Sequence, residues 1–239
     1  MRCALCLQES ELQRSHVIPE FLYRSLYDDK HRLQVLSTLG DRGNWLEQKG
    51  LREPLLCSPC EQKLSGWERY ASLVLQGGLP LTIRREGKII FVAGLDYLKF
   101  RLFQLSILWR ASVSKLAFFR RVRLGPHEEV LRHWLNTGEG GDPQMYGCLM
   151  FGINLSGSAF TQVIMQPVAS RVNGVRSYRF MFGGFVWAYL VSSQSLGGAF
   201  AACTLKPDGS ALFMVQPAQS MQDLASFSKE LSRLGRAPG

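Results

Sequence analysis

The sequence predicts an α+β protein, in which a cysteine-rich N-terminal module is followed by a domain of helices and a mostly antiparallel sheet. Two Cys-x-x-Cys pairs in the first quarter of the chain indicate the module. A long apolar run at 95–117 indicates a buried helix, and short apolar runs separated by turn residues indicate strands over 145–217. We therefore divide the chain into a module at 1–78 and an α+β domain at 79–239, with a basic helical segment at 81–124.

The charge of the chain is concentrated in that segment. The protein has 239 residues, of which 46% are hydrophobic and 20% charged, as is typical of a folded chain. Residues 81–124 hold 10 basic and 2 acidic side chains and supply nearly all of the net charge of +9. Such a block indicates either a binding surface for a polyanion, most often nucleic acid, or a solvated helix face.

No segment of the sequence predicts a membrane span. The longest apolar stretch, at 182–205, is interrupted by polar residues at 192–194 and by paired glycines. No basic, then apolar, then small-residue leader precedes Cys3. We therefore expect a cytoplasmic protein.

Four of the six cysteines form two Cys-x-x-Cys pairs with 50 residues between them. The paired residues are Cys3, Cys6, Cys57 and Cys60. A chain without a secretion signal is expected to keep its thiols reduced, and two pairs of this spacing supply the four thiolates of a tetrahedral structural zinc site. Cys148 and Cys203 lie in apolar runs and are interpreted as buried, inert thiols.

The residues around each pair predict the local fold. A short turn holds the first pair, and a strand follows that ends at His16. Pro19 suits the first turn of a helix, and 33–56 is predicted to be a hairpin or loop. Ser58 and Glu61 have the spacing of a capping box at the start of a second helix. A zinc knuckle, a hairpin and a helix that carries the second pair make a treble-clef layout.

The motifs CALC, SHVIP and LLCSPC, the last followed by a helix, resemble the zinc-containing HNH (ββα-metal) endonucleases over about the first third of the chain, residues 1–76. In that family a strand ends in a metal-ligand residue, followed by a general-base histidine, two apolar residues and a proline. The resemblance implies phosphodiester hydrolysis with one divalent ion, Mg²⁺ or Mn²⁺, while the histidine takes a proton from water. It also implies a role in bacterial defence or in a mobile element.

The resemblance assigns roles position by position. His16 matches the general base. Ser15 stands where the family usually has an acidic or histidine ligand. Glu61 stands where a ligand histidine is common, so it is either a metal ligand or the partner in a capping box. The family's loop asparagine does not precede the second cysteine pair; Asn44, farther back, takes that role if the hairpin folds over, and Glu68 is a further ligand to consider.

The second part of the chain supplies most of the basic residues. Residues 81–92 predict a hairpin with its turn at Glu86 and Gly87, and a basic loop follows the buried helix. The side chains expected to bind nucleic-acid phosphates are Arg84, Arg85, Lys88, Arg120, Arg121 and Arg123.

Two further elements of this part are predicted from their patterns. The helix at 95–117 has Asp96 as its cap, and three basic side chains are expected to emerge from its rims: Lys99, Arg101 and Arg110. The paired glycines at 183 and 184 predict a bulge or bend within one long strand at 177–191.

Two functional hypotheses follow. The first is an HNH-type metal-dependent endonuclease that acts on DNA rather than RNA. Structural zinc holds its fold, His16 is its base, and its β-rich half binds a target or a partner protein. The second is a module that has lost its catalytic metal and serves as a zinc-stapled adaptor for nucleic acid or protein.

Overall fold

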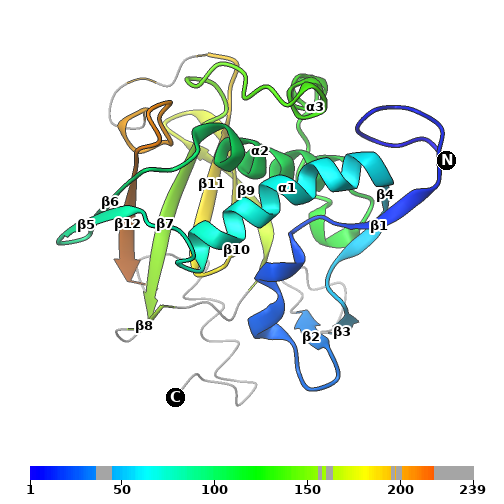
Figure 1. Cartoon of the computed structure of the whole chain (residues 1–239), viewed down its shortest axis with the longest axis horizontal. Helices are drawn as coiled ribbons and strands as arrows, with labels where there is room; N and C mark the ends of the chain where they lie inside the picture. Colours follow the sequence, from blue (N-terminus) through cyan, green and yellow to red (C-terminus); the bar gives the residue numbers. More distant parts are fainter. Residues whose placement is uncertain (36–44, 156–157, 160–163, 195–196, 198–200, 218–239) are drawn as a thin grey trace.

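The computed structural model of the chain describes residues 1–35, 45–155, 158–159, 164–194, 197 and 201–217. Helices and strands occur together, which confirms the α+β class, and the cysteine pairs lie at one end of helix α1 (Figure 1). The elements in chain order are β1 (Leu12–His16), η1 (Glu20–Leu22), η2 (Arg24–Leu26), β2 (Arg32–Val35), β3 (Trp45–Gln48), β4 (Arg52–Cys57), α1 (Ser58–Leu75), β5 (Thr82–Glu86), β6 (Ile89–Ala93), α2 (Tyr97–Val113), η3 (Ala117–Phe119), α3 (His127–Thr137), β7 (Cys148–Leu155), β8 (Ser158–Ala159), β9 (Met165–Val172), β10 (Val175–Phe182), β11 (Phe185–Val191) and β12 (Ala211–Pro217).

The N-terminal part is built on two strands and one helix. β1 ends at His16, as predicted, and pairs antiparallel with β4, so that His16 lies opposite Arg52. The turn that holds the first cysteine pair is fixed to β4 because Ala4 N donates to Leu55 O over 3.1 Å. α1 follows β4 without a loop. This arrangement brings the second cysteine pair beside the first. The treble-clef layout itself remains a prediction.

The helix predicted after Pro19 is wrong in type. Two 3-10 turns, η1 and η2, stand there, and the chain is extended at Pro19 before them and at Tyr27 after them. Tyr23, between the two turns, is fully buried, and a Cβ atom on Gly50 would lie 3.1 Å from its ring. The packing of Tyr23 against Gly50 fixes the position of the two turns. Because Gly50 is far from Tyr23 in the sequence, the residue pattern around Pro19 could not predict this contact.

The hairpin predicted within 33–56 forms from β2 and β3, with Leu33 opposite Glu47. β4 does not join it, because β4 pairs with β1 instead. Asn44, the predicted catalytic asparagine, lies outside the described residues.

The capping box predicted at the start of α1 is wrong. The N-cap residue is Cys57 and receives no side-chain hydrogen bond, and Ser58 is already the first helical residue. Pro59 occupies the first turn, where its missing N–H costs nothing. The helix ends at Leu75, two residues before Gly77, which has a φ of +73°.

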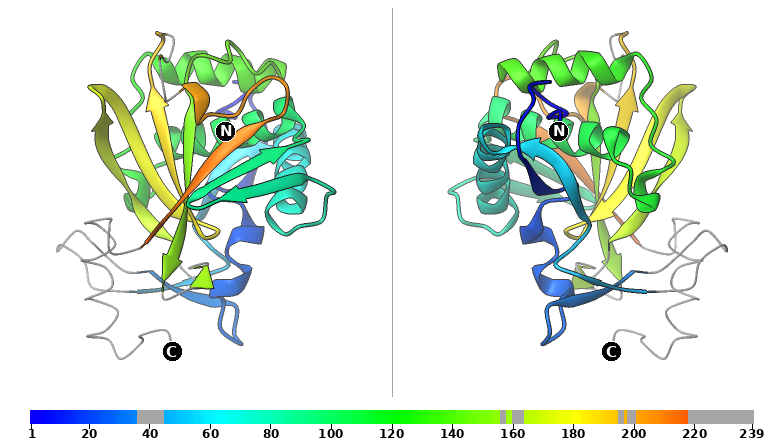
Figure 2. Two further views of the ribbon diagram at one scale, coloured as in Figure 1. Left: turned by 90° about the vertical axis from the view of Figure 1, so that its left-hand side faces the viewer. Right: turned by 90° about the vertical axis from the view of Figure 1, so that its right-hand side faces the viewer.

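The second part contains an eight-stranded sheet in the order β5-β6-β12-β7-β11-β10-β9, with β8 paired to β7 outside this path. All its described pairings are antiparallel except that of β12 with β7. β5 and β9 are therefore its two edges. Figure 2 shows the strong twist of the strands and places α1 and α2 on the same side of the sheet.

α2 lies between α1 and the sheet and forms the centre of the core. Asp96 caps it as predicted, by accepting a hydrogen bond from Lys99 N. Phe100 and Phe103 pack on Trp187 of β11, with ring centroids 6.2 and 5.9 Å away. Most of the described core side chains of the N-terminal part and of the sheet part form one continuous cluster, and Leu149, Ala188 and Leu190 form a small separate one in the sheet. The boundary at residue 78 therefore remains a prediction.

The expectation that three basic side chains emerge from the rims of α2 is wrong for two of them. Lys99 is exposed, but Arg101 and Arg110 are 3% and 1% exposed. Because α2 is covered on nearly all sides, a basic residue in its middle can be accommodated only if it is paired inside.

The single long strand predicted at 177–191 is also wrong, because β10 and β11 form a tight hairpin there. Phe182 lies opposite Phe185, and Gly183 and Gly184 make the turn with φ values of +61° and +81°. Both values lie in the left-handed region, which glycine adopts without strain, so the glycine pair reverses the chain instead of bending it. Among the described helices, none is long and apolar enough to cross a membrane.

Candidate metal centre and active site

Four thiols converge at the N-terminal end of α1. The sulfur atoms of Cys3, Cys6, Cys57 and Cys60 all lie within 4.8 Å of one another, and Cys6 Sγ is 3.7 Å from Cys57 Sγ. A tetrahedral zinc ion with bonds of about 2.3 Å to sulfur requires sulfur atoms about 3.8 Å apart. The four cysteines can therefore bind a metal ion such as zinc, as their spacing predicted.

Burial and backbone donors act on these thiols in opposite directions. Burial disfavours the thiolate of Cys3, but the N–H groups of Cys57, Cys6 and Leu5 donate to it and lower the pKa of this thiol to about 7. The distance from Cys57 N to Cys3 Sγ is 3.3 Å. Burial raises the pKa of Cys60, and the neighbouring sulfur atoms raise it further. A cation that neutralises the thiolates stabilises this arrangement, and thiolate ligands favour a soft ion such as zinc.

The four-cysteine cluster is also tied to the second part of the chain. Arg132 of α3 donates from Nη1 to the carbonyl oxygen of Leu5 over 2.6 Å, between the two cysteines of the first pair. The same guanidinium is paired with Glu129, one turn earlier in α3. α3 therefore holds the first cysteine pair from outside the N-terminal part.

His16 ends β1 with its ring held at one nitrogen. Nε2 lies 2.8 Å from the carbonyl oxygen of Lys49. Because a carbonyl oxygen only accepts, Nε2 carries the proton, and Nδ1 of the neutral ring remains an acceptor. Within the described part of the chain, no donor occupies Nδ1. The ring is half-buried, so one nitrogen is fixed while the other can receive a proton.

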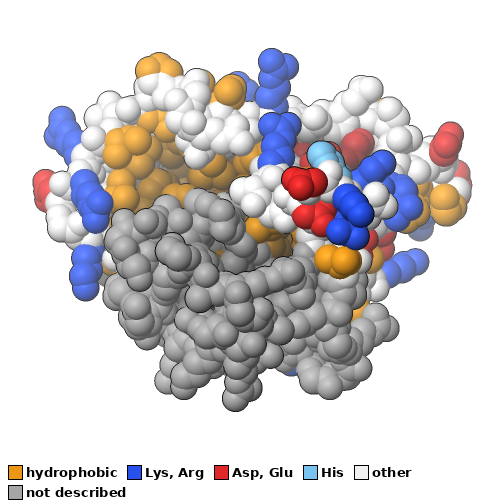
Figure 3. Space-filling view, turned by 90° about the horizontal axis from the view of Figure 1, so that it is seen from below, with side chains coloured by type: hydrophobic (Ala, Val, Ile, Leu, Met, Phe, Trp, Pro, Cys, Tyr) orange, Lys and Arg blue, Asp and Glu red, His pale blue; other side chains and the backbone are white. Residues whose placement is uncertain are grey.

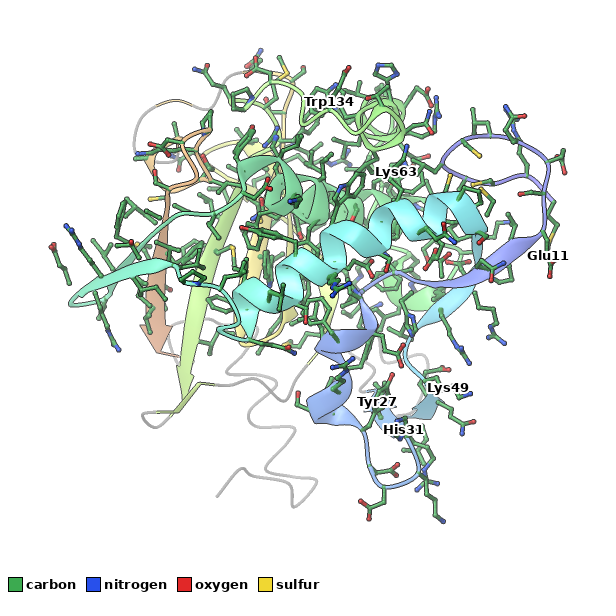
Figure 4. The ribbon with its side chains drawn as sticks, viewed as in Figure 1. Glu11, Tyr27, His31, Lys49, Lys63 and Trp134 are labelled. Atoms are coloured by element: carbon green, nitrogen blue, oxygen red, sulfur yellow. The ribbon has the colours of Figure 1, made fainter. Side chains whose placement is uncertain are left out.

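The backbone that presents this carbonyl is unusual. Lys49 and Gly50 have φ values of +61° and +73°, in the left-handed region. A Cβ atom on Gly50 would lie 3.2 Å from His16 Cδ2, so the tight turn requires glycine at this position. Figure 4 shows Lys49 with Tyr27 and His31 at the base of the β2–β3 hairpin, and the rings of Tyr27 and His31 are stacked with centroids 5.2 Å apart.

Ser15 and Glu61, the two positions at which the resemblance expects metal ligands, meet in the structure. Ser15 is fully buried, and its Oγ donates to Glu61 Oε2 over 2.6 Å. Glu61 extends from the first turn of α1 toward β1 and does not cap its own helix. Its half-buried carboxylate therefore lies beside the strand that ends at His16.

Arg110 is a site residue that the sequence analysis missed. Its Nη1 lies 2.7 Å from Glu68 Oε1 and donates to the carbonyl oxygen of His16 over 2.6 Å. Burial raises the pKa of the Glu68 carboxyl, and the ion pair with Arg110 acts against that rise. Glu68, considered as a metal ligand, is thus engaged by Arg110. The signal in the sequence was a lone arginine within the apolar run LSILWRAS.

The six predicted phosphate-binding side chains are all exposed, but they form two separate surfaces. Arg84, Arg85 and Lys88 belong to the β5–β6 hairpin, at one edge of the sheet. The others follow η3, which packs beside β9 at the other edge. The two edges are six strand spacings apart, or about 29 Å along the sheet. Figure 3, which shows the molecule from below, has basic side chains at several places around this face, with hydrophobic side chains between some of them.

The segment that leads into η3 contacts β4, the strand paired with β1. Ser114 Oγ and Lys115 N both donate to the carboxylate of Glu53 in β4. Farther along, Arg123 N donates to the hydroxyl of Tyr178 in β10 over 3.1 Å. The segment from 114 to 123 therefore runs from the β1–β4 pair to the edge of the sheet.

The described residues do not form a second metal site in which three or more protein side chains surround the ion. Among them, the four cysteines are the only group of three or more potential ligand side chains gathered closely enough to hold an ion. Comparisons of the chain with protein-family models, with curated proteins and with solved structures found no match. Function is therefore inferred from the site itself.

Proposed function

We propose that the protein is an HNH-type metal-dependent endonuclease that acts on DNA, with His16 as the general base. The observation that carries the proposal is the contact between His16 Nε2 and the Lys49 carbonyl oxygen. It favours the tautomer in which Nδ1 is unprotonated, and it holds the ring in one orientation. A general base needs both properties, a free acceptor and a fixed direction.

The metal-binding cysteines serve as a structural staple in this proposal. They join the first turn of the chain, the end of β4 and the start of α1. β1 and α1 are thereby held side by side, and His16 and Glu61 belong to these two elements. Zinc with four cysteine ligands has no open position for water or substrate, so its role is to hold the fold.

Glu61 is the residue proposed to bind the catalytic Mg²⁺ or Mn²⁺. Mg²⁺ commonly binds proteins through one or two carboxylates and completes its shell with water and substrate phosphate, so a single carboxylate beside the strand that carries the base fits this mode. When bound, such an ion would stabilise the charge that develops on the phosphate. Ser15 orients Glu61 through its short hydrogen bond.

The exposed arginines after η3 are the phosphate-binding surface that this proposal favours. The residues just before η3 contact Glu53 of β4, and Glu53 is next to Arg52, the residue opposite His16. The β5–β6 hairpin lies at the far edge of the sheet, so it would contact DNA away from the scissile phosphate. Both surfaces attract nucleic acid through their charge.

A second candidate function is a zinc-stapled adaptor that binds nucleic acid or a partner protein without cleaving it. The hydrogen bond between Ser15 and Glu61 favours it, because a serine replaces the charged ligand that the resemblance expects and occupies one carboxylate oxygen. In this case the β-rich half would carry the partner site.

A plasmid-relaxation assay at low salt separates the two functions. The endonuclease predicts nicking with Mg²⁺ or Mn²⁺ that a weak chelator abolishes while the protein keeps its zinc. The adaptor predicts retention of DNA on a gel with either ion and no nicked product. Absence of both binding and nicking by folded, zinc-loaded protein would contradict the nucleic-acid role itself.

A further inference from the structure

Arg110 connects the centre of the second part to the end of β1. We propose that Arg110 is a positioning residue for His16, so that α2 of the sheet part is an integral component of the site. The kinetic consequence rests on the endonuclease function proposed above. The geometric consequence, that Arg110 fixes the orientation of the His16 ring, does not depend on cleavage.

The guanidinium of Arg110 is almost completely surrounded. The side chain is 1% exposed, and its Nε donates to the carbonyl oxygen of Ser106 over 3.2 Å, one turn earlier in α2. Nη2 lies 3.2 Å from Ser106 Oγ. These contacts lock the arginine to its own helix, so that Nη1 points in one direction.

Nη1 uses this fixed direction to hold two elements of the N-terminal part. It bridges the carbonyl oxygen of His16 and the carboxylate of Glu68, which belong to β1 and α1 respectively. Hydrogen bonds that involve a charged donor are about twice as strong as neutral ones. The peptide group of His16 is therefore held from α2, while its ring is held from the Lys49 carbonyl.

Two anchors are needed because His16 is the last residue of its strand. β1 ends there, and the next backbone bond to the neighbouring segment is a long one, from Val17 N to Leu51 O over 3.3 Å. A shift of about 1 Å in a catalytic group can reduce a rate about 100-fold. Without the bond from Arg110, the peptide group of His16 would keep only the long bond from Val17 N to Leu51 O, and the ring would lose its alignment with Lys49.

Arg101 provides a matched control on the same helix. It is also buried, and it donates to three backbone carbonyls, those of Gly140, Asp142 and Met145. Its partners lie in the loop after α3 and not in the N-terminal part. Arg101→Met therefore removes an equally buried arginine from α2 without touching His16.

The experiment compares the full-length protein with Arg110→Met, Arg110→Lys, the double variant Glu68→Leu/Arg110→Met, and the control Arg101→Met. The double variant is included because replacing both members of a buried ion pair by apolar side chains often preserves stability, whereas removing one member does not. Zinc content and thermal unfolding establish that each variant is folded. ¹⁵N spectra of labelled histidine, assigned with His16→Ala, report the tautomer of the His16 ring, and DNA cleavage gives kcat and KM.

The proposal predicts that wild type and Arg101→Met show His16 protonated at Nε2, while the folded double variant shows a mixture of tautomers. It predicts a kcat about 100-fold lower in the double variant with KM within about twofold, and partial recovery in Arg110→Lys. A zinc-loaded double variant with the wild-type His16 spectrum would overturn the positioning role. Absence of cleavage by wild type would instead overturn the endonuclease function, and the spectra would still decide the role of Arg110.

Discussion

Ser15 Oγ donates a 2.6 Å hydrogen bond to Glu61 Oε2, which joins the strand that ends at His16 to the first turn of α1. At the positions of Ser15 and Glu61, the HNH family usually has two metal ligands, each acidic or a histidine. Because serine is neutral, this pair carries a single negative charge. A site with a single carboxylate depends on water and substrate phosphate to complete the shell of a divalent ion.

The variant Ser15→Asp tests whether residues 15 and 61 can form a cation-binding site. The new carboxylate would face that of Glu61, and the two charges would repel unless a divalent ion lies between them. We expect a lower melting temperature for Ser15→Asp in chelator, and recovery of several degrees on addition of Mn²⁺. Ser15→Asn, similar in shape but neutral, is the control and should respond no more than wild type. A melting temperature of Ser15→Asp that ignores Mn²⁺ would show that the pair does not form a cation site.

Removal of the structural metal should unfold the N-terminal part. Cys57→Ser leaves three sulfur ligands, and structural zinc contributes about 10–16 kcal/mol to the folding of small zinc domains. We expect elemental analysis to find one zinc per wild-type chain and a large loss in the variant, with a lower unfolding temperature. Cys203→Ser, a change at a half-buried cysteine outside the cluster, should retain the metal. Equal zinc content in both variants would exclude Cys57 as a ligand.

The two basic surfaces can be separated by paired charge reversals. Arg121→Glu/Arg123→Glu and Arg84→Glu/Arg85→Glu change the net charge equally, at opposite edges of the sheet. Each lost phosphate contact should reduce the slope of log affinity against log salt by about 0.9. We expect the larger reduction in slope, and the larger loss of cleavage, for the pair after η3. The reverse order would place the DNA on the β5–β6 hairpin.

Asp28 gives a prediction of pH dependence at the base of the β2–β3 hairpin. Side-chain hydrogen bonds from Arg32, together with its backbone N–H, lower the pKa of the Asp28 carboxyl from 3.8 to about 2. Since the folded pKa is depressed, the stabilisation is present above the unfolded value and is lost as the pH falls from about 4 through about 2. Carboxyl NMR titration should give a midpoint near 2 in wild type, and Arg32→Gln should raise it toward the ordinary value. An unchanged midpoint in Arg32→Gln would refute this assignment.

The four-cysteine cluster could be predicted from sequence because its information is local. Two Cys-x-x-Cys pairs need only their spacing to suggest four converging thiols, and the strand that ends at His16 is a short local pattern. Asp96 as a helix cap was predictable for the same reason, since its bond reaches only to Lys99 N.

Contacts between distant segments could not be predicted in this way. Glu61 has the spacing of a capping box, but the charge-assisted bond to Ser15, which only the folded chain brings near, is made instead. The sequence of α2 alone suggests that Arg110 lies at the rim of the helix. Its burial depends on two partners from other elements, Glu68 and the His16 carbonyl, which the local sequence does not reveal. The glycines at 183 and 184 suit either a bend or a reversal, and the pairing of β10 with β11 selects the reversal.

The measurement that tests the central claim most directly is plasmid cleavage with Mn²⁺ by wild type beside His16→Ala and His133→Ala. His133 is exposed on α3, so its replacement controls for the loss of an imidazole elsewhere in the chain. We predict that wild type and His133→Ala cleave equally, while His16→Ala retains its zinc and is slower by a factor of about 100 or more. Cleavage by zinc-loaded His16→Ala at the wild-type rate would contradict the assignment of His16 as the base.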